Sequence, residues 1–173
     1  VTDWFLRLSK PMMKEPKKMP DGLLITVKEP KWRKVLPHFR ALCRKAVGAL
    51  VDLKTCEVSV VLANDKFVHQ LNLEYRHIDR STNVLSFPLP YTEVDDVMRP
   101  MGDIVLALET LEREAAEQNK TLEAHLTHLL VHGALHLSGY DHILDEEAKQ
   151  MEALEVEKMQ MLGFENPDKG EIR

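Results

Sequence analysis

The sequence predicts one α/β (α+β) domain in which a small mixed sheet of about four strands packs with about five helices. Its 173 residues, 44% of them hydrophobic, suit a single domain with a sizeable core. Short β-branched runs alternate with stretches that have apolar residues at helical spacing, and from residue 108 onward the pattern is helical only. We expect an extension over 1–20, the domain over 21–166 with its sheet covered on one side, and a tail over 167–173.

The first half of the predicted domain alternates strands and helices. Leu23–Lys28 has the β-branched residues and the length of a strand. Trp32–Leu50 carries apolar residues at helical spacing, and Pro37 falls in its first turns, where a proline is tolerated. Glu57–Ala63 alternates and then becomes continuously apolar, as a strand entering a sheet interior does.

The second half begins with a helix that Asn64 and Asp65 can cap. A charged loop, Arg76–Thr82, follows this helix. Thr121 caps the helix that carries most of the histidines, and Glu123 in its first turn suits the helix dipole. The remaining predicted elements are strands at Asn83–Pro88 and Gly102–Ala107 and helices at Leu108–Gln118 and Ile143–Leu162.

A stretch rich in histidine, His125–His142, holds five of the eight histidines. In a helix, His132 and His136 lie on one face with Cβ atoms about 5 to 6 Å apart, so both rings can bind one metal ion. Gly139 tolerates the left-handed conformation that ends a helix, and His142 can then supply a third ligand from outside it. Three protein ligands leave a fourth position for water, as in catalytic zinc sites. We therefore predict one zinc ion (Zn2+) per chain on these three histidines.

Other histidine pairs have similar spacing. His128 and His132 are also four residues apart, and His125 shares their stripe of the helix. Only the pair His132 and His136 is followed closely by a glycine and a further histidine, and for this reason we prefer it. The alternative is that these histidines are surface or core residues of a helix whose leucines face the core. For His125 and His128 we favour that alternative.

The composition excludes a membrane span and a secretory signal. No apolar run approaches the roughly 20 residues that cross a bilayer, and the amino terminus has no long apolar segment or small-residue cleavage site. Cys43 and Cys56 lack a CxxC partner and suit the reduced, buried cysteines of a cytoplasmic protein. We therefore expect a cytoplasmic chain with no membrane partner.

The charge distribution is compatible with a polyanionic partner. Residues 1–54 contain 13 Lys/Arg and 5 Asp/Glu, a net charge of +8, whereas the rest contains 10 and 23, a net charge of −13. A basic face suits a nucleic acid, although charged helix faces are more often only solvated. The best candidate for a phosphate-facing surface is the first predicted helix, with the basic residues Lys31, Arg33, Lys34, Arg40, Arg44 and Lys45.

Three blocks of the sequence are distinctive when they are taken together and in order. They are LNLEYRHIDRSTNVLSFP at 71–88, MGDIVLA at 101–107 and HGALHLSGYDH at 132–142. The blocks resemble the YbeY family of rRNA-maturation endoribonucleases, and the resemblance covers roughly residues 57–166. Asn83 stands where many members carry aspartate, but asparagine also occurs there in the family.

The resemblance implies a bacterial, cytoplasmic, single-metal hydrolase that cleaves single-stranded RNA. It implies zinc ligands at His132, His136 and His142 and a functionally essential arginine at Arg76, so Arg76 and His132 are the predicted catalytic residues. The implied task is maturation of the 3′ end of 16S ribosomal RNA, together with ribosome quality control. The implied partners are the 16S rRNA precursor in the small ribosomal subunit, a small-subunit ribosomal protein and an assembly GTPase.

The chemistry of RNA cleavage fits these residues. A bound metal lowers the pKa of its water to about 7, and a guanidinium can clamp two phosphate oxygens. We assign that clamp to Arg76, for which the alternative is a surface salt bridge. Asp141 is a candidate to orient a ligand imidazole or to stabilise the turn, and Ser86 is a candidate to contact a phosphate or the backbone. The general base stays open between the metal hydroxide and a substrate phosphate.

Two other classes of protein compete with the nuclease hypothesis. The spacing of His132, His136, Gly139 and His142 also resembles the metzincin proteases, whose glutamate general base follows the first histidine. Gly133 occupies that position here, which opposes a metzincin-like zinc hydrolase or protease. The other alternative is a non-catalytic ribosome assembly factor with a structural metal, which the basic helix would serve equally well.

Overall fold

The computed structural model describes residues 22–91, 93 and 98–164. The predicted extension over 1–20 and the predicted tail over 167–173 lie outside the described residues. Within them the chain forms a four-stranded mixed sheet and six helices, which confirms the predicted α/β architecture. None of the helices in this part of the chain combines the length and the apolar character that a bilayer crossing requires.

The sheet has the strand order β1-β2-β4-β3. β1 (Leu23–Val27), β2 (Cys56–Ala63) and β4 (Arg99–Ala107) run parallel, whereas β3 (Val84–Pro88) pairs antiparallel with β4 at the edge. Each predicted strand is therefore confirmed. β4 begins three residues earlier than the sequence pattern indicated, at Arg99 instead of Gly102.

The predicted helix over Trp32–Leu50 is wrong as a single element. It is split into α2 (Trp32–Val35) and α3 (Phe39–Gly48). Pro37 has no N–H to donate, and its ring disfavours helical geometry at the preceding Leu36, whose φ of -136° and ψ of 79° are not helical. The proline therefore separates two helices, and this accounts for the sixth helix where about five were predicted.

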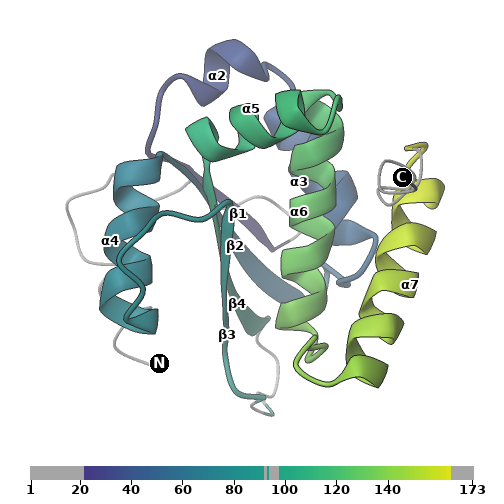
Figure 1. The fold of residues 1–173 in the computed structure, drawn as a ribbon. Helices are drawn as coiled ribbons and strands as arrows, with labels where there is room; N and C mark the ends of the chain where they lie inside the picture. Colours follow the sequence, from purple (N-terminus) through teal and green to yellow (C-terminus); the bar gives the residue numbers. More distant parts are fainter. Residues whose placement is uncertain (1–21, 92, 94–97, 165–173) are drawn as a thin grey trace.

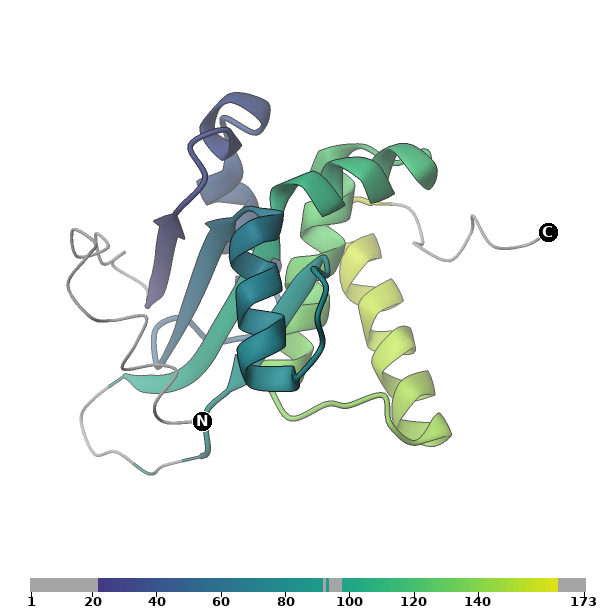
Figure 2. The same ribbon diagram turned by 60° about the vertical axis from the view of Figure 1, so that its left-hand side comes forward.

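Helices cover both faces of the sheet, so the predicted coverage of only one side is wrong (Figure 1 and Figure 2). Successive residues of a strand point to opposite faces, and β2 and β4 are apolar at both sets of positions. Val61 and Val105 belong to one core, whereas Val60 and Ile104 belong to the other. The continuously apolar end of β2 therefore reflects burial on both faces.

The two faces carry layers of unequal size. The smaller core lies under α4 (Asp65–Arg76). The larger core lies under α3, α5 (Leu108–Glu117) and α6 (Leu122–Leu137). α7 (Asp145–Met161), yellow in Figure 1, packs against α6 on the side away from the sheet. α6 is thus enclosed between the sheet and α7.

Two predicted helix caps are confirmed. At the start of α4, the Asn64 side chain accepts a hydrogen bond from the Phe67 N–H at 2.9 Å. At the start of α6, the Thr121 hydroxyl accepts one from the Ala124 N–H at 3.1 Å. These side chains satisfy backbone N–H groups that have no partner within the helix, so each helix begins close to the residue that the sequence predicts.

The two cysteines are free thiols, as predicted. Cys43 lies fully buried in α3, and burial raises the pKa of its thiol to about 12. The thiol therefore stays uncharged at neutral pH and acts as a small apolar side chain. Cys56, at the start of β2, is only partly buried.

α6 is the central helix of the larger layer. Ten of its 16 residues are buried, because it packs against α3, α5, α7 and the sheet. It approaches the sheet closely at Gly133, where an added Cβ would lie 2.9 Å from Ile104 Cγ2 and 3.1 Å from Ser86 Oγ. Side-chain atoms do not tolerate such distances, so the packing of α6 on β3 and β4 requires glycine at this position.

Gly133→Ala should destabilise the protein by about 1 to 3 kcal/mol, because the added methyl group overpacks the contact with Ile104 and Ser86. Gly48→Ala is the matched control, since a Cβ there would meet Leu53 Cδ1 at an ordinary 3.7 Å. Urea denaturation of both variants measures the free energy of unfolding. Equal stability of the two variants would contradict this account of how α6 packs.

Candidate metal centre

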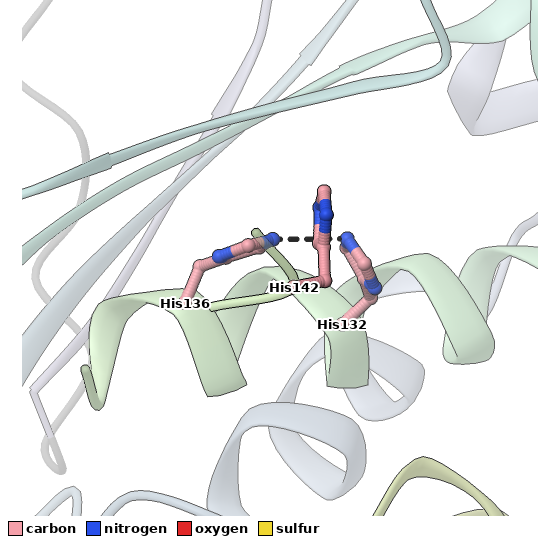
Figure 3. A group of neighbouring side chains, drawn as sticks. All are labelled: His132, His136 and His142. Atoms are coloured by element: carbon pink, nitrogen blue, oxygen red, sulfur yellow. Dashed lines mark hydrogen bonds between the residues drawn. The ribbon is translucent and has the colours of Figure 1, made fainter. Parts of the chain in front are cut away.

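Three histidines converge where α6 ends (Figure 3). His132 and His136 lie one turn apart on α6, and the turn that contains Gly139, whose φ is +97°, returns His142 to the same place. One ring nitrogen of each residue lies within 4.8 Å of the other two. The Nε2 atoms of His132 and His136 are 3.1 Å apart. The structure thus brings the three predicted ligands together.

Hydrogen bonds on the outer side of two rings determine where their hydrogens lie. His136 Nδ1 is 3.0 Å from the backbone oxygen of Tyr140, and His132 Nδ1 contacts the carboxylate of Glu155. A carbonyl or carboxylate oxygen only accepts, so each Nδ1 carries a hydrogen, and a ring in its neutral form then presents a bare Nε2 lone pair. The two Nε2 atoms face each other at 3.1 Å, where a cation can accept a lone pair from each ring.

A zinc ion or a similar divalent metal fits this arrangement. Two bonds of about 2.0 to 2.1 Å in tetrahedral geometry separate the ligand nitrogens by about 3.3 Å. The Nε2 atoms of His132 and His136 are 3.1 Å apart, which is close to that value. His142 is exposed, so the group opens to solvent on one side. An open coordination position is typical of catalytic zinc sites, whereas structural sites are closed.

Burial and neighbouring rings keep His136 in the form that binds metals. Burial lowers the pKa of His136, and the nearby His132 and His142 lower it further. The carboxylate of Asp141 and the backbone of Tyr140 oppose this shift only in part. The imidazole of His136 is therefore neutral at neutral pH, as metal coordination requires.

Glu155 of α7 is a residue of the site that the sequence prediction missed. It is only 8% exposed, and its carboxylate contacts His132 Nδ1 through one oxygen and His128 Nε2, at 3.1 Å, through the other. Burial alone would raise the pKa of Glu155, but the hydrogen bonds from His128 and His132 outweigh burial and lower the pKa to about 2. One signal was present in the sequence. Met151, Glu155 and Met159 are four residues apart, so a single carboxylate interrupts the buried stripe of α7.

His125 and His128 lie outside the three-histidine cluster, in agreement with the alternative that the sequence favoured for them. His125 is buried, and its Nε2 is 2.7 Å from a carboxylate oxygen of Glu114 on α5. The same carboxylate accepts a hydrogen bond from the Asn83 amide at 3.0 Å. These contacts join α6, α5 and the residue before β3, so Asn83 has a structural partner in Glu114.

Arg76, the predicted phosphate clamp, is the exposed last residue of α4. Its Nη2 donates a hydrogen bond to the backbone oxygen of Ser86 on β3 at 3.4 Å. The Ser86 hydroxyl lies on the α6 side of the strand, against Gly133. Gly133 directly follows His132 in the sequence. Arg76 therefore contacts β3, the strand against which α6 packs. In the described part of the chain no carboxylate forms an ion pair with Arg76, which opposes the salt-bridge alternative.

The two weaker candidates of the sequence have structural partners. Asp141 Oδ1 accepts a hydrogen bond from the His142 N–H at 2.8 Å, so this carboxylate stabilises the turn that carries His142. Ser86 is 9% exposed, and its hydroxyl lies where α6 and β3 meet at Gly133. The Ser86 hydroxyl is thus directed into the packing contact between helix and sheet, away from the solvent that a phosphate would occupy.

Two hollows flank the three histidines. One has a volume of about 440 Å³ and includes His136 and Tyr140 in its wall. The other has a volume of about 320 Å³ and includes His132 and His142. Each hollow is therefore lined by at least one of the three clustered histidines.

Comparison with known proteins identifies the family. The family model described as Endoribonuclease YbeY matches residues 25–163. A protein named Endoribonuclease YbeY from Sinorhizobium fredii is 53% identical over 112 residues, which cover 64% of this chain and 65% of that protein. A protein of the same name from Agrobacterium fabrum is 51% identical over 116 residues, which cover 66% of this chain and 69% of that protein. The chain thus spans just under two thirds of the length of the Sinorhizobium relative.

A solved structure is also similar. The solution structure of a Thermotoga maritima protein is 28% identical, with a TM-score of 0.49, and the match covers 87% of this chain and 97% of that one. At that TM-score the likeness does not bear on the assignment. The match to the family model does bear on the family assignment, because it spans more than half of the chain and contains Arg76, Glu155 and the three clustered histidines. The chain therefore belongs to the YbeY endoribonuclease family.

Proposed function

We propose that this chain is a metal-dependent endoribonuclease that cleaves single-stranded RNA at the centre formed by His132, His136 and His142. The observation that carries the proposal is the meeting of two Nε2 atoms at 3.1 Å, in a group of three histidines that is open to solvent. Membership of an endoribonuclease family supports RNA as the substrate. From the family resemblance we infer a task in maturation of the 3′ end of 16S ribosomal RNA and in ribosome quality control.

The proposed setting is the bacterial cytoplasm. The RNA partner is the 16S rRNA precursor in the small ribosomal subunit, and a small-subunit ribosomal protein and an assembly GTPase are the proposed protein partners. This setting rests on the resemblance of the three sequence blocks. The net charge of +8 over residues 1–54 also supports a polyanionic partner.

The three histidines and Arg76 have separate roles in the proposal. His132, His136 and His142 would hold one Zn2+ through their ring nitrogens. A metal bound there lowers the pKa of a water molecule to about 7 and polarises a phosphoryl oxygen. The guanidinium of Arg76 has five N–H donors, and one of them is used by the Ser86 backbone oxygen. The remaining donors have no hydrogen-bond partner among the described residues and would clamp the phosphate of the substrate in a bidentate manner.

The packing of α6 opposes a metzincin-like hydrolase or protease. In that class a glutamate general base directly follows the first histidine ligand. Position 133 faces the sheet, where even a Cβ would lie 2.9 Å from Ile104. A glutamate at this position would point into the core of the protein, away from the metal. Position 133 therefore supplies neither the glutamate general base of that class nor the space for one.

A non-catalytic assembly factor with a structural metal is the second alternative. Structural zinc sites close the coordination sphere with four protein ligands. Among the residues that the structure describes, the group that could hold a metal contains three histidines, and one of them is exposed. This open side favours a catalytic centre over a structural one.

His136→Ala should lose the metal, whereas Arg76→Ala should keep the fold and the metal but lose cleavage by a factor of about 10² to 10³, because one preorganised charge is removed. Arg76→Lys should recover only part of the activity, since an ammonium cannot form the bidentate fork. Metal content and cleavage of a structured ribosomal RNA fragment are measured on the same preparations.

Lys149→Ala, an exposed change on α7, is the control for these variants. The assigned roles require that His136→Ala loses metal and cleavage together and that Arg76→Ala loses cleavage alone. If both variants cleave like the parent protein, the nuclease is a contaminant, and the assembly-factor alternative becomes the better one.

Metal affinity should fall on acidification. Burial, assisted by His132 and His142, lowers the pKa of His136 below its ordinary value of 6.5, so this ring stays neutral to more acidic pH than an exposed histidine. The affinity should decrease as the pH drops through that lowered pKa, because protons then compete with the metal for the ring. Competition with a chromophoric chelator between about pH 5 and 8 measures the affinity. An affinity that increases on acidification would exclude neutral imidazole ligands.

Charge reversal on the basic surface of α2 and α3 should weaken RNA binding and make it less sensitive to salt, because fewer counterions are released. Arg40 and Lys45 are exposed there, whereas Lys31 is engaged by Glu112 at 2.8 Å. We therefore choose the double change Arg40→Glu and Lys45→Glu and measure RNA affinity against salt concentration. Lys149→Glu on α7 is the matched control. Unchanged binding by the double variant would remove this surface from the proposal.

A further inference from the structure

We propose that Glu155 is a positioning residue that couples metal binding at His132 to the docking of α7 on α6. This inference rests on the metal centre of the proposed function. It concerns a part of the chain that supplies no ligand itself. The carboxylate of Glu155 is the only charged group on the buried stripe of α7, within the residues that the structure describes.

α7 is attached to the domain by few buried side chains. Of its 17 residues, three are buried, namely Met151, Glu155 and Met159. These residues are four apart and face α6. Leu154 is partly buried and also packs against the core. The helix lies outside α6, away from the sheet (Figure 1). The two hydrogen bonds of Glu155 therefore add to the apolar contacts of Met151 and Met159 in holding α7 in place.

The carboxylate of Glu155 is fixed at two points. One oxygen accepts from His132 Nδ1, and the other is 3.1 Å from His128 Nε2, one turn earlier on α6. His128 Nδ1 is buried with no hydrogen-bond partner among the described residues. The hydrogen of a neutral His128 therefore lies on Nε2, where Glu155 accepts it. With both oxygens engaged, the carboxylate cannot rotate away from His132.

This contact acts on the metal through the ring of His132. A carboxylate that accepts from Nδ1 fixes the tautomer, keeps Nε2 directed at the metal and increases the basicity of Nε2. The metal in turn draws electron density from the ring, which strengthens the Nδ1–H as a donor to Glu155. Coupling of this kind is reciprocal: the factor by which docked α7 raises metal affinity equals the factor by which the metal favours docking.

Glu155→Gln tests the coupling, and Glu152→Gln is the matched control. Both changes remove one negative charge from α7, but Glu152 is exposed and has no hydrogen bond to a histidine in the described structure. Zinc affinity is measured by chelator competition, and the opening of α7 by hydrogen exchange of residues 145–161 with and without zinc. Glu155→Gln should lose about 10- to 100-fold in zinc affinity, and Glu152→Gln less than about threefold. Zinc should slow exchange of α7 in the parent protein and in the control, but not in Glu155→Gln.

The tautomer of His132 gives a readout without metal or activity. In the metal-free parent protein, nitrogen NMR should show His132 with its hydrogen on Nδ1, and in Glu155→Gln a mixture of tautomers. If Glu155→Gln does not fold, His128→Gln replaces it, with a smaller loss of zinc affinity and faster exchange of α7. Parent-like zinc affinity in the variant, or zinc that leaves α7 exchange unchanged in the parent, would overturn the coupling. A parent protein that binds no zinc would instead overturn the proposed function, and the coupling with it.

Discussion

The close contact of α6 with the sheet at Gly133 fixes the position of His132 and His136, two of the three candidate metal ligands. Because a helix turns every 3.6 residues, His132 and His136 project together to one side of that contact. They cannot shift relative to β3 and β4 unless the packing of Gly133 against Ile104 opens. The geometry of the chelating pair is therefore set by an apolar contact on a neighbouring face of the same helix.

A second set of contacts selects the tautomer of the histidines along α6. His136 donates to the backbone of Tyr140, His132 to Glu155, and His125 contacts Glu114. These acceptors come from three different elements, which are the turn after α6, α7 and α5. α6 supplies the spacing of the rings, and the surrounding elements supply their orientation. Loss of any one acceptor would leave the spacing intact but free a ring to rotate.

Local patterns in the sequence were sufficient for the strands, which have short apolar β-branched runs. They were also sufficient for the caps at Asn64 and Thr121 and for the three clustered histidines, because these depend on contacts between residues close in sequence. The features that were missed depend on tertiary packing. Pro37 can begin a helix or separate two, and the choice follows from how α2 and α3 pack. Glu155 meets His132 only when α7 docks on α6, which no spacing in the sequence specifies.

Within the described residues, β3 is an edge strand that pairs on one side only, with β4. Open strand edges invite pairing with strands of other molecules, and charged side chains at such edges oppose it. Arg76 extends from α4 to the carbonyl of Ser86 on this strand. Arg76 thus places a positive charge at this edge, so a neutral side chain at position 76 should make the domain more prone to edge-to-edge self-association.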